Sequence, residues 1–145
     1  TRAHTPPADW AVWLLLISPL MRLRATEVES VGDGTGRVRV VVENTRGLPT
    51  NITSKALERK AVRAMEGRLT GGDGVTVIGD AVIELGQLAG RVGKHSMLGG
   101  FGGTSDPTAD RVKAEWSVQA PSGASVDVEV WSPRAGVARI TCELA

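Results

Sequence analysis

The sequence predicts an all-β fold, an antiparallel β-sandwich with a short N-terminal helix. Short segments in which apolar and polar residues alternate recur from residue 20 onwards. Clusters of Gly, Pro, Asp and Ser separate these segments, as turns do in a sandwich. One continuous apolar run stands apart near the start of the chain. A chain of 145 residues is long enough to bury a core without disulfides.

The apolar run WAVWLLLI occupies residues 10–17. We expect a helix over residues 8–18, with Asp9 as its N-cap and Pro19 after its end, because proline cannot continue a helix. The run is too short to cross a bilayer, which takes about 20 residues. Its apolar side chains lie almost all round the helix, so another surface must cover them.

The following segment predicts a β-hairpin. Apolar and polar residues alternate over residues 20–31, the turn sequence GDG follows at 32–34, and residues 36–44 form the second arm. The inward-facing side chains of this arm are Val38, Val40 and Val42, and the outward-facing ones are Arg37, Arg39 and Glu43.

The middle of the chain is less regular. Residues 54–65 place apolar side chains on one helical face, and Ser54 precedes them as a cap, so the local signals predict a helix. Residues 75–85 form two short strands separated by Gly79 and Asp80. Residues 89–109 are rich in glycine, and we expect them to form a mobile surface loop.

The last third of the chain has the clearest strand pattern. Residues 110–120 alternate with Trp116 on the inward side, the valines of 126–130 form the next strand, and residues 138–144 form the last. Six to eight short strands with turns at this spacing are typical of an immunoglobulin-like β-sandwich.

Charge and chemistry exclude several function classes. The formal net charge is +1, which argues against nucleic-acid binding. Cys142 follows the inward phase of its strand and is expected to be a buried structural thiol. His4 and His95 belong to no zinc-binding pattern, and Ser96 lies in no nucleophile elbow. We therefore expect no catalytic residue, no metal ligand and no cofactor in this chain, and no enzyme activity from it alone.

Four side chains are candidates for an exposed contact surface, because sequence phase or position leaves them outside the predicted core. Trp131 shares its phase with the outward-facing Asp127 and Glu129. The others lie in the apolar helical segment, which could also pack against Trp131. The candidate interface residues are Trp10, Trp13, Leu14 and Trp131.

Several segments in this order resemble the region after the catalytic domain of bacterial zinc metallocarboxypeptidases of the carboxypeptidase A type. They are SPL at 18–20, VENTRGLPTN at 42–51, GQLAGR at 86–91 and DRVKAEWSVQAPSG at 110–123. In that family the turn reads N-T-G-x-L-P-T, so the glycine here is displaced by one place. The matching signature residues are Asn44, Thr45, Gly47, Leu48, Pro49 and Thr50.

The resemblance implies a division of the chain into two parts. Residues 1–19 would be the end of, or the junction to, an upstream catalytic domain, and residues 20–145 would form an accessory immunoglobulin-like domain. The family's zinc ligands match nothing here, so zinc is implied only for the upstream domain. The resemblance also suggests loop and strand over residues 54–69, against the local helix prediction.

Two functions stay open at this point. The first is a non-catalytic accessory domain that stabilises or orients the catalytic domain, or guides a peptide or cell-wall substrate to it. The second is a free-standing adhesion or carbohydrate-binding module. The expected partners are the upstream domain and, through residues 8–18, another surface of the chain or a second copy. We expect a soluble domain of the bacterial cytoplasm or cell envelope.

Overall fold

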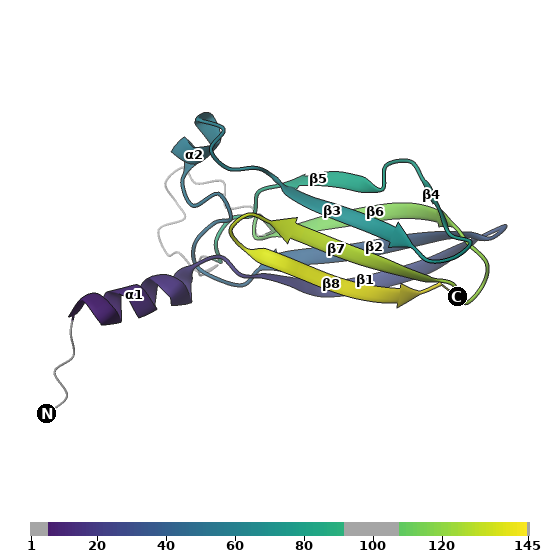
Figure 1. The fold of residues 1–145 in the computed structure, drawn as a ribbon, viewed down its shortest axis with the longest axis horizontal. Coiled ribbons are helices and arrows are strands. Elements are labelled where there is room, and N and C mark those ends of the chain that lie inside the picture. Colours follow the sequence, from purple (N-terminus) through teal and green to yellow (C-terminus); the bar gives the residue numbers. More distant parts are fainter. Residues whose placement is uncertain (1–5, 92–107, 145) are drawn as a thin grey trace, which may run out of the picture.

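The chain folds as an antiparallel β-sandwich, as predicted. The computed structural model describes residues 6–91 and 108–144, and in them the strands form two four-stranded sheets, β1-β2-β6-β4 and β5-β3-β7-β8 (Figure 1). The strands are β1 (Met21–Gly32), β2 (Thr35–Asn44), β3 (Met65–Gly71), β4 (Thr76–Ile78), β5 (Val82–Gly86), β6 (Arg111–Gln119), β7 (Ser125–Ser132) and β8 (Gly136–Glu143). The described helices are α1 (Pro6–Ile17) and α2 (Ser54–Glu58).

The predicted hairpin is present as β1 and β2. Gly32, Asp33 and Gly34 form its turn with φ values of 105°, 52° and 71°, a left-handed path that Gly and Asp adopt more readily than other residues. Val38, Val40 and Val42 are fully buried, which confirms the predicted inward face of this strand.

The core lies between the two sheets. The valines of β2 and the buried Val126, Val128 and Val130 of β7 belong to one cluster. Trp116 of β6 is 3% exposed, as its inward phase predicted. A methyl group on Gly67 of β3 would lie 3.1 Å from the Trp116 ring, so the missing side chain at Gly67 makes room for the indole.

The helix predicted over residues 54–65 is wrong beyond its first turns. The helix α2 ends at Glu58, Lys60 then takes a left-handed φ of 52°, and β3 begins at Met65. Thr53 is the N-cap instead of Ser54, since its hydroxyl accepts a hydrogen bond of 3.3 Å from the Ala56 amide. Burial of Met65 in the sheet outweighs the helical spacing that the local sequence shows.

Helix α1 begins earlier than predicted. It runs from Pro6 to Ile17, because proline fits the first turn of a helix, where its missing amide is not needed. Asp9 therefore lies in the first turn and not at the N-cap. There its carboxylate interacts favourably with the positive end of the helix dipole.

The long axis of the sandwich gives it two different ends (Figure 1). At one end lie α1, α2, the corner at residues 44–50 and the start of β1, and we call this the helix end. At the other end lie the turns at residues 32–35, 71–75 and 120–125, and we call this the turn end. The mobile loop predicted for residues 89–109 lies mostly outside the described residues.

Candidate docking surface

The described residues hold no evident site for catalysis or metal binding. Over residues 6–91 and 108–144, no group of three or more His, Cys, Asp or Glu side chains could hold a metal ion. His4, His95 and Ser96 lie outside the described residues, as does most of the glycine-rich segment at 89–109. Neither described helix is long and apolar enough to span a membrane.

Cys142 is a buried thiol, as its sequence phase predicted. Its side chain is 6% exposed on the inner side of β8. Burial raises the pKa of the Cys142 thiol, and the nearby negative charge of Asp127 raises it further. A thiol of raised pKa is a weak nucleophile near neutral pH, so the role of Cys142 is to fill the core.

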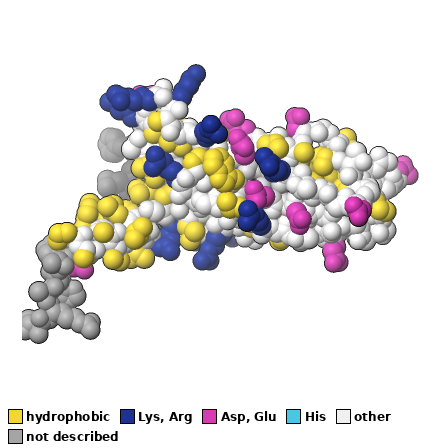
Figure 2. Space-filling view, viewed as in Figure 1, with side chains coloured by type: hydrophobic (Ala, Val, Ile, Leu, Met, Phe, Trp, Pro, Cys, Tyr) yellow, Lys and Arg dark blue, Asp and Glu magenta, His cyan; other side chains and the backbone are white. Residues whose placement is uncertain are grey.

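The most unusual surface of the molecule is helix α1. Six large apolar side chains on it are between 39% and 74% exposed, namely Trp10, Val12, Trp13, Leu14, Leu15 and Leu16. The ring centroids of Trp10 and Trp13 are 5.1 Å apart in a stacked arrangement. Figure 2 shows hydrophobic side chains over the viewed face of this helix, which projects from the end of the sandwich. The structure thus brings Trp10, Trp13 and Leu14 together on one exposed apolar element.

Helix α1 is held at its C-terminal end by the sandwich. The Arg46 guanidinium donates a hydrogen bond of 2.6 Å to the Leu16 carbonyl, and the Leu48 amide donates one of 3.0 Å to the Ile17 carbonyl. These carbonyls have no partner within the helix, and a cation near them also interacts favourably with the helix dipole. The exposed helix is therefore attached in a defined direction.

The side chain of Asn44 organises the corner that holds the helix. Its Oδ1 atom accepts hydrogen bonds of 3.2 Å from the amides of Leu20 and Arg46. Its Nδ2 atom donates to the carbonyls of Leu48, at 2.7 Å, and Ala89, at 3.1 Å. Asn44 itself is buried, at 1% exposed, and its four hydrogen bonds are partly buried. One amide group thus joins the junction after α1, the corner and the 86–91 segment.

The two threonines of the signature, Thr45 and Thr50, make similar hydrogen bonds. The amide and the hydroxyl of Thr45 both donate to the Leu20 carbonyl, at 2.9 Å and 3.1 Å. The Thr50 hydroxyl donates to Gln87 Oε1 at 2.7 Å and accepts from the Leu88 amide at 2.8 Å. The Asn and Thr side chains of this corner thus hydrogen-bond the backbone.

Gly47 and Pro49 act differently from each other. Pro49 accepts a 3.0 Å hydrogen bond from the Ile52 amide and so starts the turn that leads to α2. Gly47 is not among the glycines with left-handed φ. A Cβ on Gly47 would meet only the Ile17 Cβ, at 4.0 Å, whereas a side chain on Gly90 would overlap the Gly47 carbonyl, so the close approach requires glycine at position 90. The corner and the 86–91 segment therefore pack backbone against backbone, and Arg91 donates a 2.7 Å amide hydrogen bond to the Arg46 carbonyl.

Trp131 lies apart from the other candidate interface residues. It is partly exposed on the outward face of β7, as its phase predicted, opposite Glu66 of β3. It lines an open depression of about 390 Å³ together with Ala61, Val62, Arg63, Pro133 and Arg134. No residue of α1 lines this depression. The structure therefore separates Trp131 from Trp10, Trp13 and Leu14.

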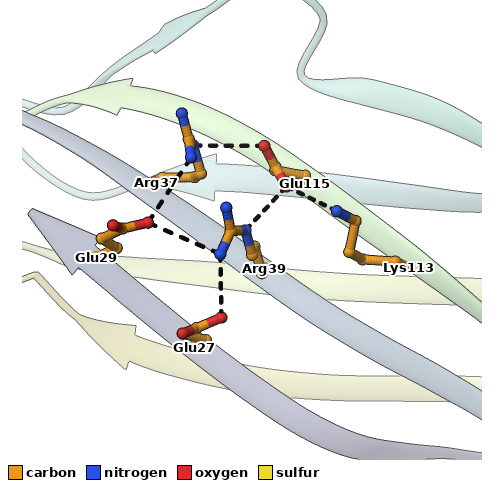
Figure 3. Close-up of polar contacts among 6 residues, drawn as sticks. All are labelled: Glu27, Glu29, Arg37, Arg39, Lys113 and Glu115. Carbon is orange, nitrogen blue, oxygen red and sulfur yellow. Dashed lines mark hydrogen bonds and ion pairs between the residues drawn. The ribbon is translucent and has the colours of Figure 1, made fainter. Parts of the chain in front are cut away.

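The outer face of the β1-β2-β6 sheet carries a charge ladder of Glu27, Glu29, Arg37, Arg39, Lys113 and Glu115 (Figure 3). Arg39 Nε lies 2.9 Å from Glu115 Oε2, and Arg39 Nη1 lies 3.3 Å from Glu27 Oε2. Lys113 Nζ lies 3.2 Å from Glu115 Oε2. Acids and bases are equal in number in the ladder, and each charge has an opposite neighbour, so these six side chains form a neutral, solvated set of ion pairs.

The sequence did not reveal Arg46 as a functional residue. It holds the C-terminal end of a helix thirty residues earlier in the chain. A basic residue in the last turn of a helix is a recognisable signal, but α1 has none in its own last turn. Only the fold brings this guanidinium to the Leu16 carbonyl.

The comparisons with known proteins place the chain in a family. Residues 20–143 match the family described as "Domain of unknown function (DUF8731)", so the chain belongs to that family. The match begins just after α1 and covers the whole sandwich. A comparison with curated proteins found no match.

Proposed function

We propose that this member of the DUF8731 family is a non-catalytic accessory domain that docks onto a neighbouring domain through α1. The observation that carries the proposal is the exposed apolar surface of a helix whose direction is set by hydrogen bonds from Arg46 and Leu48. A helix that is apolar all round is normally buried. Covering its six exposed side chains would contribute about 1 kcal/mol or more for each.

The sequence of α1 by itself gives the helix little stability. An isolated helix of 12 residues is marginal in water, and most helical stability comes from packing an apolar face. The hydrogen bonds between α1 and the sandwich lie at its C-terminal end, at Leu16 and Ile17. A docking partner would therefore stabilise the rest of the helix.

We further propose that the neighbouring domain is a zinc carboxypeptidase of the carboxypeptidase A type. The support is the sequence resemblance, and its two most distinctive segments lie in one structural unit. The 44–50 corner and the 86–91 segment contact each other through Asn44, Thr50 and Gly90, and the corner holds the end of α1. Residues from both of these segments thus help to position the helix.

In this proposal the sandwich and the neighbouring domain have separate roles. The neighbouring domain would hold zinc and hydrolyse C-terminal residues of peptides. The sandwich would stabilise or orient that domain, or guide a peptide or cell-wall substrate to it. None of the described residues of this chain would contact the reacting atoms.

The reading frame before the Thr1 codon tests the identity of the neighbour. The expected result is an encoded domain with an H-x-x-E motif and a later His, the pattern that supplies three zinc ligands. A frame that encodes no such domain would contradict the carboxypeptidase part of the proposal. Zinc-dependent release of C-terminal residues by the 145-residue chain alone would contradict the non-catalytic part.

A second candidate function, carbohydrate binding, has one observation in its favour. Trp131 presents an aromatic side chain beside the exposed Arg63 and Arg134 at an open depression. Aromatic rings are common platforms for sugar rings, and arginines suit acidic groups. Calorimetric titration with acidic and neutral oligosaccharides tests it: binding that is lost in Trp131→Ala and kept in Trp10→Ala would favour this function over docking.

A further inference from the structure

We infer that the surface which receives α1 is an apolar groove of a protein, rimmed by carboxylates. This inference rests on the proposed docking role of α1 and adds the chemistry of its partner. It is argued from the distribution of charge along the sandwich, from the tip of the helix and from the charge that a second copy would bring.

The helix end of the sandwich is basic. The segments at residues 45–64 and 87–91 lie at the helix end and contain six Lys or Arg and a single acid, Glu58. We call these six residues the basic collar: Arg46, Lys55, Arg59, Lys60, Arg63 and Arg91. Figure 2 shows Lys and Arg side chains gathered over α2, at the same end of the molecule as the apolar helix.

The turn end of the sandwich has the opposite character. Its three turns, at residues 32–35, 71–75 and 120–125, contain Asp33 and Asp73 and no Lys or Arg. Although the net charge of the chain is only +1, Lys and Arg are concentrated at the helix end and the turn end carries Asp. A partner that covers α1 must approach the basic end, and carboxylates around its apolar groove would complement the collar.

A second copy of this chain fits the helix end poorly. Pairing two α1 helices would cover apolar surface, but it would also bring two basic collars together. Like charges placed opposite each other weaken an interface and suppress wrong partners. The charge distribution thus favours a different protein over self-association through residues 8–18.

A lipid surface fits the tip of the helix poorly. Asp9 lies in the first turn of α1, the end farthest from the sandwich. Insertion along the helix axis would carry this charge into hydrocarbon, where ionised side chains are costly. Insertion on one side would leave exposed apolar residues on the other side in water. A protein groove can cover all sides and leave the tip in contact with polar groups.

The test uses the full-length protein as the gene encodes it, in its own host cells. A photo-reactive benzophenone amino acid replaces Leu15, the most exposed apolar residue of α1, and mass spectrometry identifies the residues that are cross-linked. The expected result is a cross-link to an apolar protein segment flanked by Asp and Glu. Cross-links only to lipid, or only to a second copy of this chain, would overturn the inference.

Hydrogen exchange of the α1 amides tests the collar itself. The triple variant Lys55→Gln, Arg59→Gln, Lys60→Asn removes three exposed charges, with Asn at 60 because that position has a left-handed φ. If the collar faces carboxylates, the helix should undock more often and its amides should exchange about tenfold faster. A matched control variant, Ser30→Glu, Thr76→Glu, Ser122→Glu, changes the net charge equally at exposed positions away from the helix and should leave exchange unchanged.

The two proposals can fail separately. A protein cross-link together with unchanged exchange in the collar variant would overturn the acidic rim and leave the docking role of α1 intact. No cross-link at Leu15, with α1 exchanging as fast as an unstructured peptide, would overturn the docking role as well.

Discussion

Strand β2 and helix α1 are both rich in apolar residues, and the chain treats them in opposite ways. Val38, Val40 and Val42 are fully buried, whereas Leu15 is 74% exposed. Alternation gives β2 one apolar face, and the second sheet of the same chain covers that face. Helix α1 is apolar all round, and one end of a sandwich cannot cover a projecting cylinder. The alternating pattern of β2 thus indicates a core strand, whereas the all-round apolar pattern of α1 indicates a surface that the sandwich does not cover.

The largest expected effect concerns the buried side of this comparison. Trp116→Ala should lower the free energy of unfolding by about 3–5 kcal/mol, because the indole fills the space above Gly67 and little can replace it. Urea denaturation of the 145-residue chain measures the change. Trp116→Phe is the matched control and should cost clearly less. Phenylalanine keeps an aromatic ring and removes the indole N–H, for which no hydrogen-bond partner is found among the described residues.

The next effect concerns the joint between the two regions. Asn44→Ala should cost about 2–3 kcal/mol, because partly buried backbone groups of Leu20, Leu48 and Ala89 lose their partner. Exchange of the amides at residues 14–20 should also become faster, since the corner positions the end of the helix. Asn51→Ala is the control: Asn51 makes one exposed hydrogen bond, to the Thr53 carbonyl, and its loss should cost well under 1 kcal/mol. Equal effects of the two substitutions would mean that Asn44 does not organise the corner.

The sequence predicted the structure best in segments that show a single periodicity and that pack one face against the core. The inward valines of β2 and β7, the turn at Gly32–Gly34 and the outward Trp131 could be predicted because alternation fixes the face of every residue in a strand. The local spacing of residues 54–65 is helical throughout, but the helix ends at Glu58, because Met65 is needed in β3. Burial of Met65 is a tertiary effect that no local window contains.

The candidate site was only partly predictable for the same reason. Trp10, Trp13 and Leu14 were identified because an all-round apolar run is visible in the sequence. The convergence of Asn44, Leu20 and Ala89 depends on contacts across as many as 45 positions. Asn44 and Gly90 belong to two segments on which the resemblance is based, but only the fold shows that these segments pack together and hold α1.

A smaller, pH-dependent effect is expected from the charge ladder. The hydrogen bond from Arg39, and then that from Lys113, lowers the pKa of the exposed Glu115 carboxyl below its ordinary value of 4.5. A lowered carboxyl pKa in the folded state stabilises the fold above the unfolded pKa, and this contribution disappears as pH falls through the folded pKa. Arg39→Gln should therefore reduce the urea midpoint at pH 7 but not at pH 2. High salt should shrink the difference, because the pair is exposed.

The control for the ladder is Arg68→Gln. Arg68 is an exposed arginine of β3 for which no ion pair is found among the described residues. Its substitution should leave both the midpoint at pH 7 and its pH dependence unchanged. A pH-dependent change as large as that of Arg39→Gln would show that general charge, and not the contact with Glu115, is responsible.

The smallest expected effect lies on the exposed side of the comparison. Leu15→Ala should change the free energy of unfolding of the 145-residue chain by less than about 0.5 kcal/mol, because its side chain is 74% exposed and Ala is a good helix former. A loss above about 1.5 kcal/mol, measured by urea denaturation, would mean that Leu15 is already covered. If that loss grew with protein concentration, the cover would be a second copy, and if not, it would be the chain's own surface. Either result would remove the difference between β2 and α1 from which the docking proposal is argued.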